Sequence, residues 1–276
     1  MADSAFQTQY RDEFIAGFEQ RQSLVRSTTT TETDIKGNTA VFLVADSGSA
    51  NATTRGANGL IPARADNLTQ NSATLAEWHD LVRRTGFNLY ASQGDGRRIM
   101  QETTMGVLNR KVDADIIAQL ETGTQDTGTA ATMSLSLVMY AVAILGNNAV
   151  PMDGNISGLI TPGAYAYLMQ TKEFANVDYV NNKPFENSLT MFRWAGVNWI
   201  VHPNLTGKGT SAEKCIVYHK SAIGHACDVA SIATAVGYDE EQDYSFARAS
   251  AYMGSKLLQN TGVVIVNHDG SAFTPQ

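Results

Sequence analysis

The chain has 276 residues, a formal net charge of −7 at neutral pH and a hydrophobic fraction of 43%. This length and apolar content provide a sizeable core, in one large domain or two small ones, and exclude disorder over most of the chain. The acidic balance argues against a dedicated nucleic-acid binder, and two cysteines indicate a reducing compartment rather than a disulfide scaffold.

The N-terminal residues 3–26 are predicted to form an amphipathic helix. Its aromatic residues recur every four positions and therefore share one helical face; they are Phe6, Tyr10, Phe14 and Phe18. A helix this short is marginal alone in water, so the stripe needs a surface to pack on. The first ten residues lack the basic and apolar segments of a secretory signal. The segment therefore reads as an arm, followed by a polar linker.

Residues 37–70 contain one apolar run, 41–45, and then a long tract rich in Gly, Ala, Asn, Ser and Thr. Structureless loops beyond ~15 residues are uncommon in compact domains and tend to be functional. We predict an extended two-stranded excursion with its tip near 48–59. Because such a hairpin cannot form its own core, it needs a partner surface.

Two helices are predicted next. The stretch TLAEWHDLVRRTG, 74–86, favours a short helix that Gly86 ends. A longer helix begins near Arg98, is stopped by Gly123 and measures ~36 Å at ~1.5 Å per residue. Its apolar residues are spaced three and four apart: Met105, Leu108, Val112, Ile116 and Leu120.

The second half alternates helices and strands. Residues 132–145 form a buried helix whose apolar run is too short to span a bilayer. A strand over 155–161 leads into a helix that Thr161 caps and Pro162 opens. The remaining predictions are a hairpin over 188–204 around Ala195-Gly196, a strand over 214–219 followed by a short helical piece, and a strand over 228–239. Residues 243–269 are predicted to form two strands joined by an Asn-Thr-Gly turn.

The stretch CIVYHKSAIGHAC, 215–227, holds two cysteines and two histidines. Its spacing lacks the close pair of ligands that zinc sites carry at each end. On a helix, His219 and His225 would lie ~120° apart, so they could not face one ion. We predict no metal site and no cofactor. No nucleophile elbow, phosphate loop or dinucleotide motif occurs either.

A long helix, a projecting hairpin and a detached arm, without a motif for reaction chemistry, indicate a protein that assembles through exchanged extensions. Three segments resemble tailed-phage major capsid proteins with the α+β Hong Kong 97 capsid fold. The first, LVRRTGFNLYASQGDGRRIMQETTMGVLNRKVDADIIAQLETG, is similar to the approach to their spine helix. The others are AVPMDGNISGLITPGAYAYLMQTKEF, and WAGVNWIVHPNL followed by KCIVYHKSAIGHA.

The resemblance implies a division of the chain into five parts. These are an N-terminal arm, 1–36; an extended loop over a neighbouring subunit, 37–74; a peripheral domain with the spine helix, 75–125; an axial domain, 126–240; and return strands of the peripheral domain, 241–276. The chain begins directly with the arm, so a separate scaffolding protein is expected rather than a fused one. No crosslink between subunits is assigned.

The implied function is that of a structural subunit, not an enzyme, in an icosahedral head of hexamers and pentamers that encloses double-stranded DNA. Expected partners are further copies, a portal, a separate scaffold and a decoration protein, with DNA contacted weakly and no membrane. The location is the virion, after synthesis in the host cytoplasm. The arm aromatics would pack on neighbours, while Arg55, Arg64 and Asp66 would set register.

Two alternative functions and one hypothesis about the histidines stay open at this point. A cellular nanocompartment shell of the same fold would carry a pocket for cargo peptides. A soluble enzyme with an unrecognised site would remain a monomer or dimer, so the size of the purified protein discriminates it from a shell. Within a shell, His219 and His225 remain candidates for pH-sensitive contacts between subunits.

Overall fold

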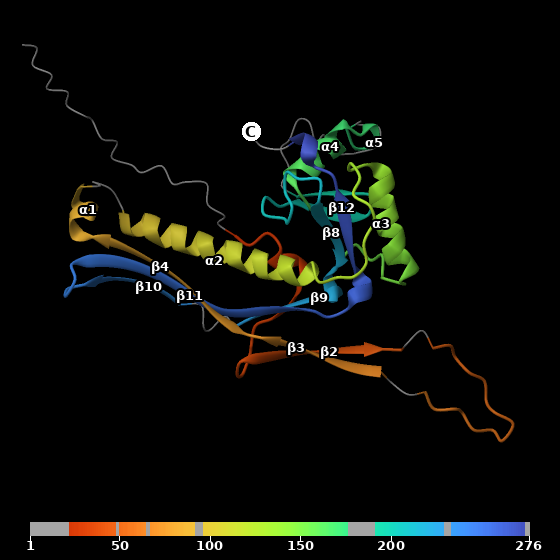
Figure 1. The fold of residues 1–276 in the computed structure, drawn as a ribbon. Coiled ribbons are helices and arrows are strands. Elements are labelled where there is room, and N and C mark those ends of the chain that lie inside the picture. Colours follow the sequence, from red (N-terminus) through yellow and green to blue (C-terminus); the bar gives the residue numbers. More distant parts are fainter. Residues whose placement is uncertain are drawn as a thin grey trace, which may run out of the picture.

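The structure, a computed structural model, describes residues 22–47, 50–64, 67–91, 96–175, 191–228 and 233–273. The molecule is elongated, with a long helix, α2 (Gly96–Leu120), lying along one sheet. A hairpin of β2 (Thr39–Asp46) and β3 (Asn67–Thr74) extends past the end of that sheet, and a second sheet with its own helices stands beside it (Figure 1). The predicted long helix and the predicted two-stranded excursion are both confirmed.

The first sheet is built around β11 (Tyr244–Leu257). Met253 of β11 pairs with both Ala76 and Cys227, so two different strands flank its opposite edges. The antiparallel neighbours are β4 (Ala76–Thr85) on one edge, and β9 (Ile223–Cys227) and β10 (Ala233–Asp239) on the other; the short β1 (Thr30–Glu32) adds a parallel strand beside β9.

The predicted helix over 74–86 is wrong, because this segment forms strand β4. The spacing of Trp78, Leu81 and Val82 fits a helix as well as a strand, and local pattern could not decide between them. The segment is a strand because all ten residues of β4 pair with residues of β11. Trp78 and Val82 face α2, whereas Leu81 is 43% exposed on the other side of the sheet.

Helix α2 packs on this sheet with the face that its apolar spacing predicts. Leu108 is buried against Ala249 and Ala251 of β11, and these small side chains let the helix approach the strand closely. The Lys111 ammonium lies 3.7 Å from the centre of the Trp78 ring, a cation–π contact that ties α2 to β4. A short helix, α1 (Gly86–Ala91), follows β4.

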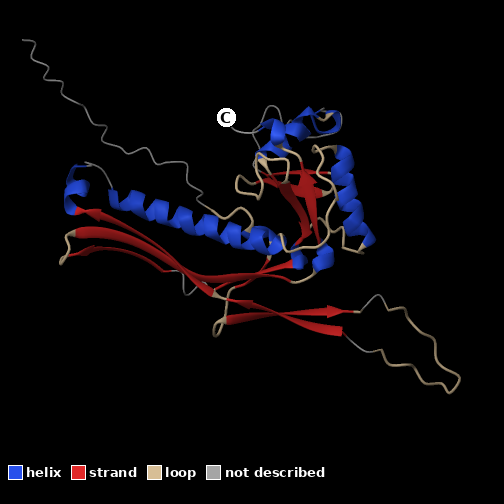
Figure 2. Ribbon diagram, in the orientation of Figure 1, coloured by secondary structure: helices blue, strands red, loops and turns tan. Residues whose placement is uncertain are grey.

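The second sheet is mixed, with the strand order β12-β8-β5-β7-β6. Helices cover it, and Figure 2 shows them in blue around the red strands. The strands are β5 (Ile156–Ile160), β6 (Met191–Trp194), β7 (Val197–Val201), β8 (Glu213–His219) and β12 (Val263–His268), and the helices are α3 (Leu135–Asn147), α4 (Pro162–Gln170) and α5 (Lys172–Ala175).

The predicted helix start and hairpin turn of this half are confirmed, whereas the helix predicted as buried, α3, has one exposed face with Met139 48% and Tyr140 54% exposed. The Thr161 side chain accepts a hydrogen bond from the Ala164 N–H at 3.0 Å, with Pro162 opening α4. Ala195 and Gly196 both have positive φ, 52° and 77°, which is the turn geometry that matches the twist of the β6–β7 hairpin.

The two sheets do not coincide with the expected axial domain, 126–240, and the expected return strands, 241–276. β9 and β10 belong to the first sheet, and β12 belongs to the second. After β8 the chain enters the first sheet through the 3₁₀ turn η2 (Lys220–Ala222), and after β11 it returns to the second sheet through η4 (Asn260–Gly262), which adjoins η2. The Leu258 N–H donates to the Ala222 carbonyl at 2.8 Å where the two turns meet.

Only 220–222 of the CIVYHKSAIGHAC stretch is helical, because β9 begins directly after these residues.

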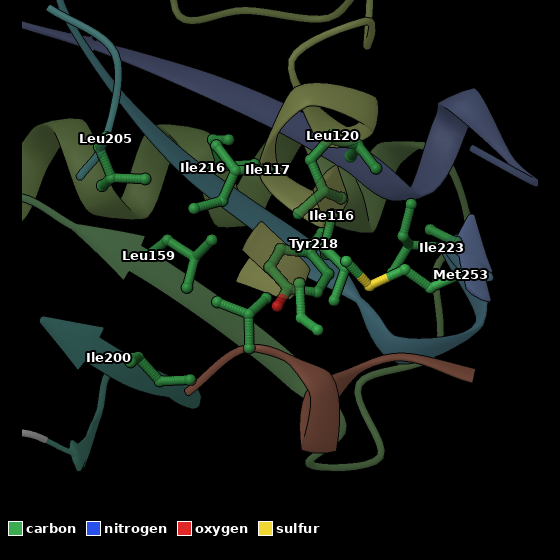
Figure 3. Close-up of a cluster of buried hydrophobic side chains, with 14 of the residues drawn as sticks. Ile116, Ile117, Leu120, Leu159, Ile200, Leu205, Ile216, Tyr218, Ile223 and Met253 are labelled. Carbon is green, nitrogen blue, oxygen red and sulfur yellow. The ribbon is translucent and has the colours of Figure 1, made fainter. Parts of the chain in front are cut away.

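One hydrophobic cluster joins α2 to both sheets. Figure 3 shows Ile116, Ile117 and Leu120 of the helix facing side chains of both sheets. The second sheet contributes Leu159, Ile200, Ile216 and Tyr218, and the first contributes Ile223, Cys227 and Met253. The two sheets therefore share a core instead of having wholly separate ones.

Candidate assembly surface

One face of the β2–β3 hairpin is an apolar surface that the described residues of the subunit leave uncovered. Directly opposed residues of antiparallel strands point to the same face, and Leu43 pairs with Gln70 while Ala45 pairs with Leu68. On this face Val41 is 46% exposed, Leu43 76% and Leu68 69%. We call these three residues the hairpin stripe. A stripe of large exposed apolar side chains on one extended element is typical of an interaction site.

The opposite face of the hairpin is buried at its base. Ala40, Phe42 and Ala73 pack with Ala226 of β9. The Phe42 ring fits over Gly224, where an added Cβ would lie only 2.9 Å from the ring. The alternation of β2 therefore holds the hairpin to the body with one side and presents the stripe with the other.

The loop beyond the hairpin carries a second exposed apolar pair. Leu60 is 74% exposed and Ile61 67% exposed. A tight turn shapes this loop, in which the Gly56 N–H donates to the Leu60 carbonyl at 3.0 Å. The predicted register residues Arg55 and Arg64 lie on the same loop and are exposed. Asp66, the third of them, lies outside the described residues.

Sequence reasoning missed the apolar members of this surface. Leu43 and Val41 were visible as alternate residues of the run 41–45, and Leu60-Ile61 as an apolar pair within a polar tract. Their exposure follows only from the register of the hairpin. The predicted arm residues Phe6, Tyr10, Phe14 and Phe18 lie outside the described residues.

The side chains of the CIVYHKSAIGHAC stretch lie in different surroundings. Cys215 is buried in the core of the second sheet, where burial raises its pKa to about 12. Cys227 belongs to the cluster shared by the two sheets. Within the described part of the chain, no three His, Cys, Asp or Glu side chains are arranged to hold a metal ion.

The two histidines of the stretch are also inside the subunit. His219 is 7% exposed, and its Nε2 lies 3.1 Å from Oδ1 of Asp153. His225 is fully buried, with Nδ1 3.0 Å from the Ser255 hydroxyl, and burial lowers its pKa to about 4. Both are therefore occupied by contacts of their own chain, which argues against contacts between subunits.

Among the described helices, none combines the length and apolarity needed to cross a bilayer. The exposed stripe and loop suit contact with another protein. Sequence comparison agrees, since the model of the family described as "Phage capsid protein" matches residues 2–270. The chain belongs to the phage capsid protein family. No curated protein matches it by sequence.

Solved structures of similar fold confirm the predicted α+β capsid architecture. A chain of "Mycobacterium phage Che8" superposes with a TM-score of 0.78 at 17% identity, covering 97% of this chain and 98% of that one. A chain of "Capsid structure of the Cyanophage P-SCSP1u" gives 0.71 at 13% identity, covering 96% and 93%. A chain of "Capsid of native GTA particle computed with C5 symmetry" gives 0.70 at 13% identity and covers 97% of both.

The family membership answers the main functional question left open by the sequence. This phage capsid protein is a structural subunit of the virion shell that assembles with further copies of itself, and it is not an enzyme. The cellular nanocompartment is not favoured by the family or by the similar structures.

Proposed function

We propose that the subunit forms hexamers and pentamers in which the hairpin of each copy lies over a neighbour. The observation that carries this proposal is the hairpin stripe: Val41, Leu43 and Leu68 are exposed side by side on an element whose other face is anchored. Full burial of one such side chain is worth about 1.5–3 kcal/mol as an upper figure. Repeated around a ring, several modest contacts give a stable shell.

The two sheets take different roles in this proposal. The second sheet, with α3, α4 and α5, corresponds to the axial domain that meets its copies at the centre of each ring. The first sheet, with α2 as its spine, corresponds to the peripheral domain. In this proposal β9 and β10 count with the peripheral unit and β12 with the axial unit, a division that their sheet membership supports.

The shell would enclose double-stranded DNA and contact it weakly. A net charge of −7 disfavours tight phosphate binding, which would hinder release of the DNA. A portal, a separate scaffold and a decoration protein are the further partners, and synthesis takes place in the host cytoplasm before assembly. The arm aromatics and the charges at Arg55, Arg64 and Asp66 would add contacts and register.

The test introduces a charge into the hairpin stripe. Leu43→Asp should abolish or strongly reduce particles when the protein is expressed together with the other head proteins of its phage, because the carboxylate would be buried at the contact. Negative-stain microscopy and gradient sedimentation measure the particles. Thr69→Asp is the matched control, since Thr69 is exposed on the opposite face of the same hairpin.

Wild-type yield from Leu43→Asp would contradict the role of the stripe. A wild-type protein that stays monomeric or dimeric with the head proteins present would contradict the assembly proposal as a whole.

A further inference from the structure

Helix α2 carries a fully buried carboxylate, Asp113, that none of the assembly contacts proposed above uses. Its Oδ1 accepts hydrogen bonds from the Ser23 hydroxyl and from the Val25 N–H at 3.3 Å. Its Oδ2 accepts from the Leu24 N–H at 3.1 Å and contacts His202 Nε2 at 3.3 Å. A buried carboxylate is costly unless it is hydrogen-bonded, and this one has a donor for each of about four acceptor positions.

Three of these donors belong to the consecutive residues 23–25, which are distant from Asp113 in sequence. The Ser23 hydroxyl oxygen also accepts the Arg26 N–H at 3.1 Å. This contact connects the carboxylate to the turn η1 (Arg26–Thr28). Two of the three donors are backbone N–H groups, so Asp113 fixes the path of the main chain rather than one side chain.

The fourth donor comes from the second sheet. His202 follows β7, and its own N–H donates to the Ile160 carbonyl at 2.9 Å. The Asn204 N–H donates to His202 Nδ1 at 3.2 Å, so Nδ1 is an acceptor and Nε2 carries the proton toward Asp113. Asp113 therefore joins the N-terminal segment, the spine helix and the second sheet at one point.

Two further contacts hold the same segment on its other side. The side chain of Val25 is fully buried in the cluster shared by the two sheets. The Thr28 hydroxyl is hydrogen-bonded to the hydroxyl of Tyr218, a buried residue of β8 at the centre of Figure 3. The segment is thus inserted between α2 and the second sheet before it continues as β1.

We propose that Asp113 is the positioning residue that fixes where, and in which direction, the N-terminal arm leaves the body of the subunit. Without its carboxylate, residues 22–28 detach from α2 while the remaining fold persists. The arm then leaves from a variable point and cannot reach one fixed place on a neighbour. This last consequence rests on the proposed assembly function; the attachment itself does not.

The test replaces Asp113 by Asn, which keeps the shape and removes the charge. In asparagine an NH₂ group replaces one of the two carboxylate oxygens. Two of the four donors that surround Asp113 would therefore lose their acceptor and meet another donor. Hydrogen exchange of the unassembled subunit should become at least ~10-fold faster for Leu24 and Val25, with exchange in β10 unchanged. Asp115→Asn is the matched control, because Asp115 lies on the same helix and has a buried oxygen without a hydrogen-bond partner.

Unchanged exchange at Leu24 and Val25 in Asp113→Asn would overturn the proposal. If that variant does not fold, Ser23→Ala removes one donor and keeps the carboxylate. It should raise exchange at these two amides by about threefold, and an unchanged rate would again overturn the proposal.

Particle formation gives the second readout. Asp113→Asn should yield few or irregular particles under conditions in which wild type and Asp115→Asn form regular ones. Regular particles from a variant with a released segment would overturn the role in assembly. Failure of the wild type to form particles would instead refute the proposed function and leave the exchange result standing.

Discussion

The hairpin and the second sheet differ in how far they bury their apolar side chains. All five residues of β5 are buried: Leu159 packs in the cluster with α2, and Ile156 and Ile160 pack in the cluster with α3 and α4. In β2 the residues alternate, and the outward ones are among the most exposed large apolar side chains of the described chain. The sheet therefore completes its core within one subunit, whereas the hairpin presents a surface that no described part of the subunit covers. Substitutions should affect folding in the first region and assembly in the second.

The largest effect is expected in the second sheet. Trp199→Ala should reduce the free energy of unfolding of the unassembled subunit by about 3–5 kcal/mol, because Trp199 is 1% exposed and its ring fills the space above Gly158. Urea denaturation measures the change. Met191→Ala, at a half-exposed position of the same sheet, is the control and should change stability by less than about 0.5 kcal/mol. Equal losses from both variants would refute the comparison.

The base of the hairpin should give the next effect. Gly224→Ala brings a Cβ to within 2.9 Å of the Phe42 ring and should destabilise the subunit by about 1–3 kcal/mol. Hydrogen exchange should report the loss mainly in β2 and β3. Gly56→Ala, whose added Cβ would make only an ordinary contact 3.7 Å from the Leu60 carbonyl oxygen, is the control.

A second substitution sharpens the test at Gly224. Combining Gly224→Ala with Phe42→Leu shortens the opposing side chain and should restore part of the stability, because the two residues are in contact. Strict additivity of the two changes would argue that the hairpin base is not packed as described.

The interior face of β9 should respond to pH, whereas its hairpin-facing side should not. Burial lowers the pKa of His225 from 6.5 to about 4, with the charge of Arg26 adding to the effect and Asp113 opposing it. As the pH falls from about 6.5 toward 4, His225 is protonated in the unfolded chain but stays neutral in the folded chain. The free energy of unfolding therefore decreases over this pH range. Between pH 7 and pH 5 the loss should be about 2 kcal/mol.

His225→Gln removes this titration, and Gln keeps a polar group near Ser255. The variant should therefore lose about 2 kcal/mol less than wild type between pH 7 and pH 5 in urea denaturation. Identical pH dependence of the two proteins would show that His225 does not titrate as its burial implies.

The smallest effect on folding is expected in the hairpin stripe. Leu43→Asp, the variant that should prevent assembly, should change the free energy of unfolding of the isolated subunit by less than about 0.5 kcal/mol, since Leu43 is 76% exposed there. A loss comparable to that of Trp199→Ala would mean that the stripe serves the subunit itself.

Much of the fold follows from local patterns in the sequence. The apolar spacing of α2, the Thr161-Pro162 helix start and the Ala195-Gly196 turn depend on neighbouring residues, and all three are confirmed. β4 was mistaken for a helix because its strand character depends on pairing with β11, which is far away in the chain. The pairing of β12 with β8 does not follow from local pattern either, since β8 precedes β12 by a long interval.

The candidate site shows the same limit. A stretch of Gly, Asn and Thr indicates a projecting loop, and the arm pattern indicates a surface that needs a partner. Whether Leu43 faces the body or the solvent depends on a register that one residue of slippage would reverse. Nothing near Asp113 in the sequence distinguishes it from Asp115, because the donors that surround Asp113 come from residues 23–25 and from His202.

The cluster of Figure 3 limits how the subunit can change shape. Ile116 and Leu120 contact a core to which both sheets contribute, so rotation of one sheet against the other would expose large apolar side chains to water. The two sheets therefore behave as one rigid body and do not rotate against each other. If the shell expands or flattens, we expect subunits to turn as rigid bodies, with bending confined to the β2–β3 hairpin beyond its buried base.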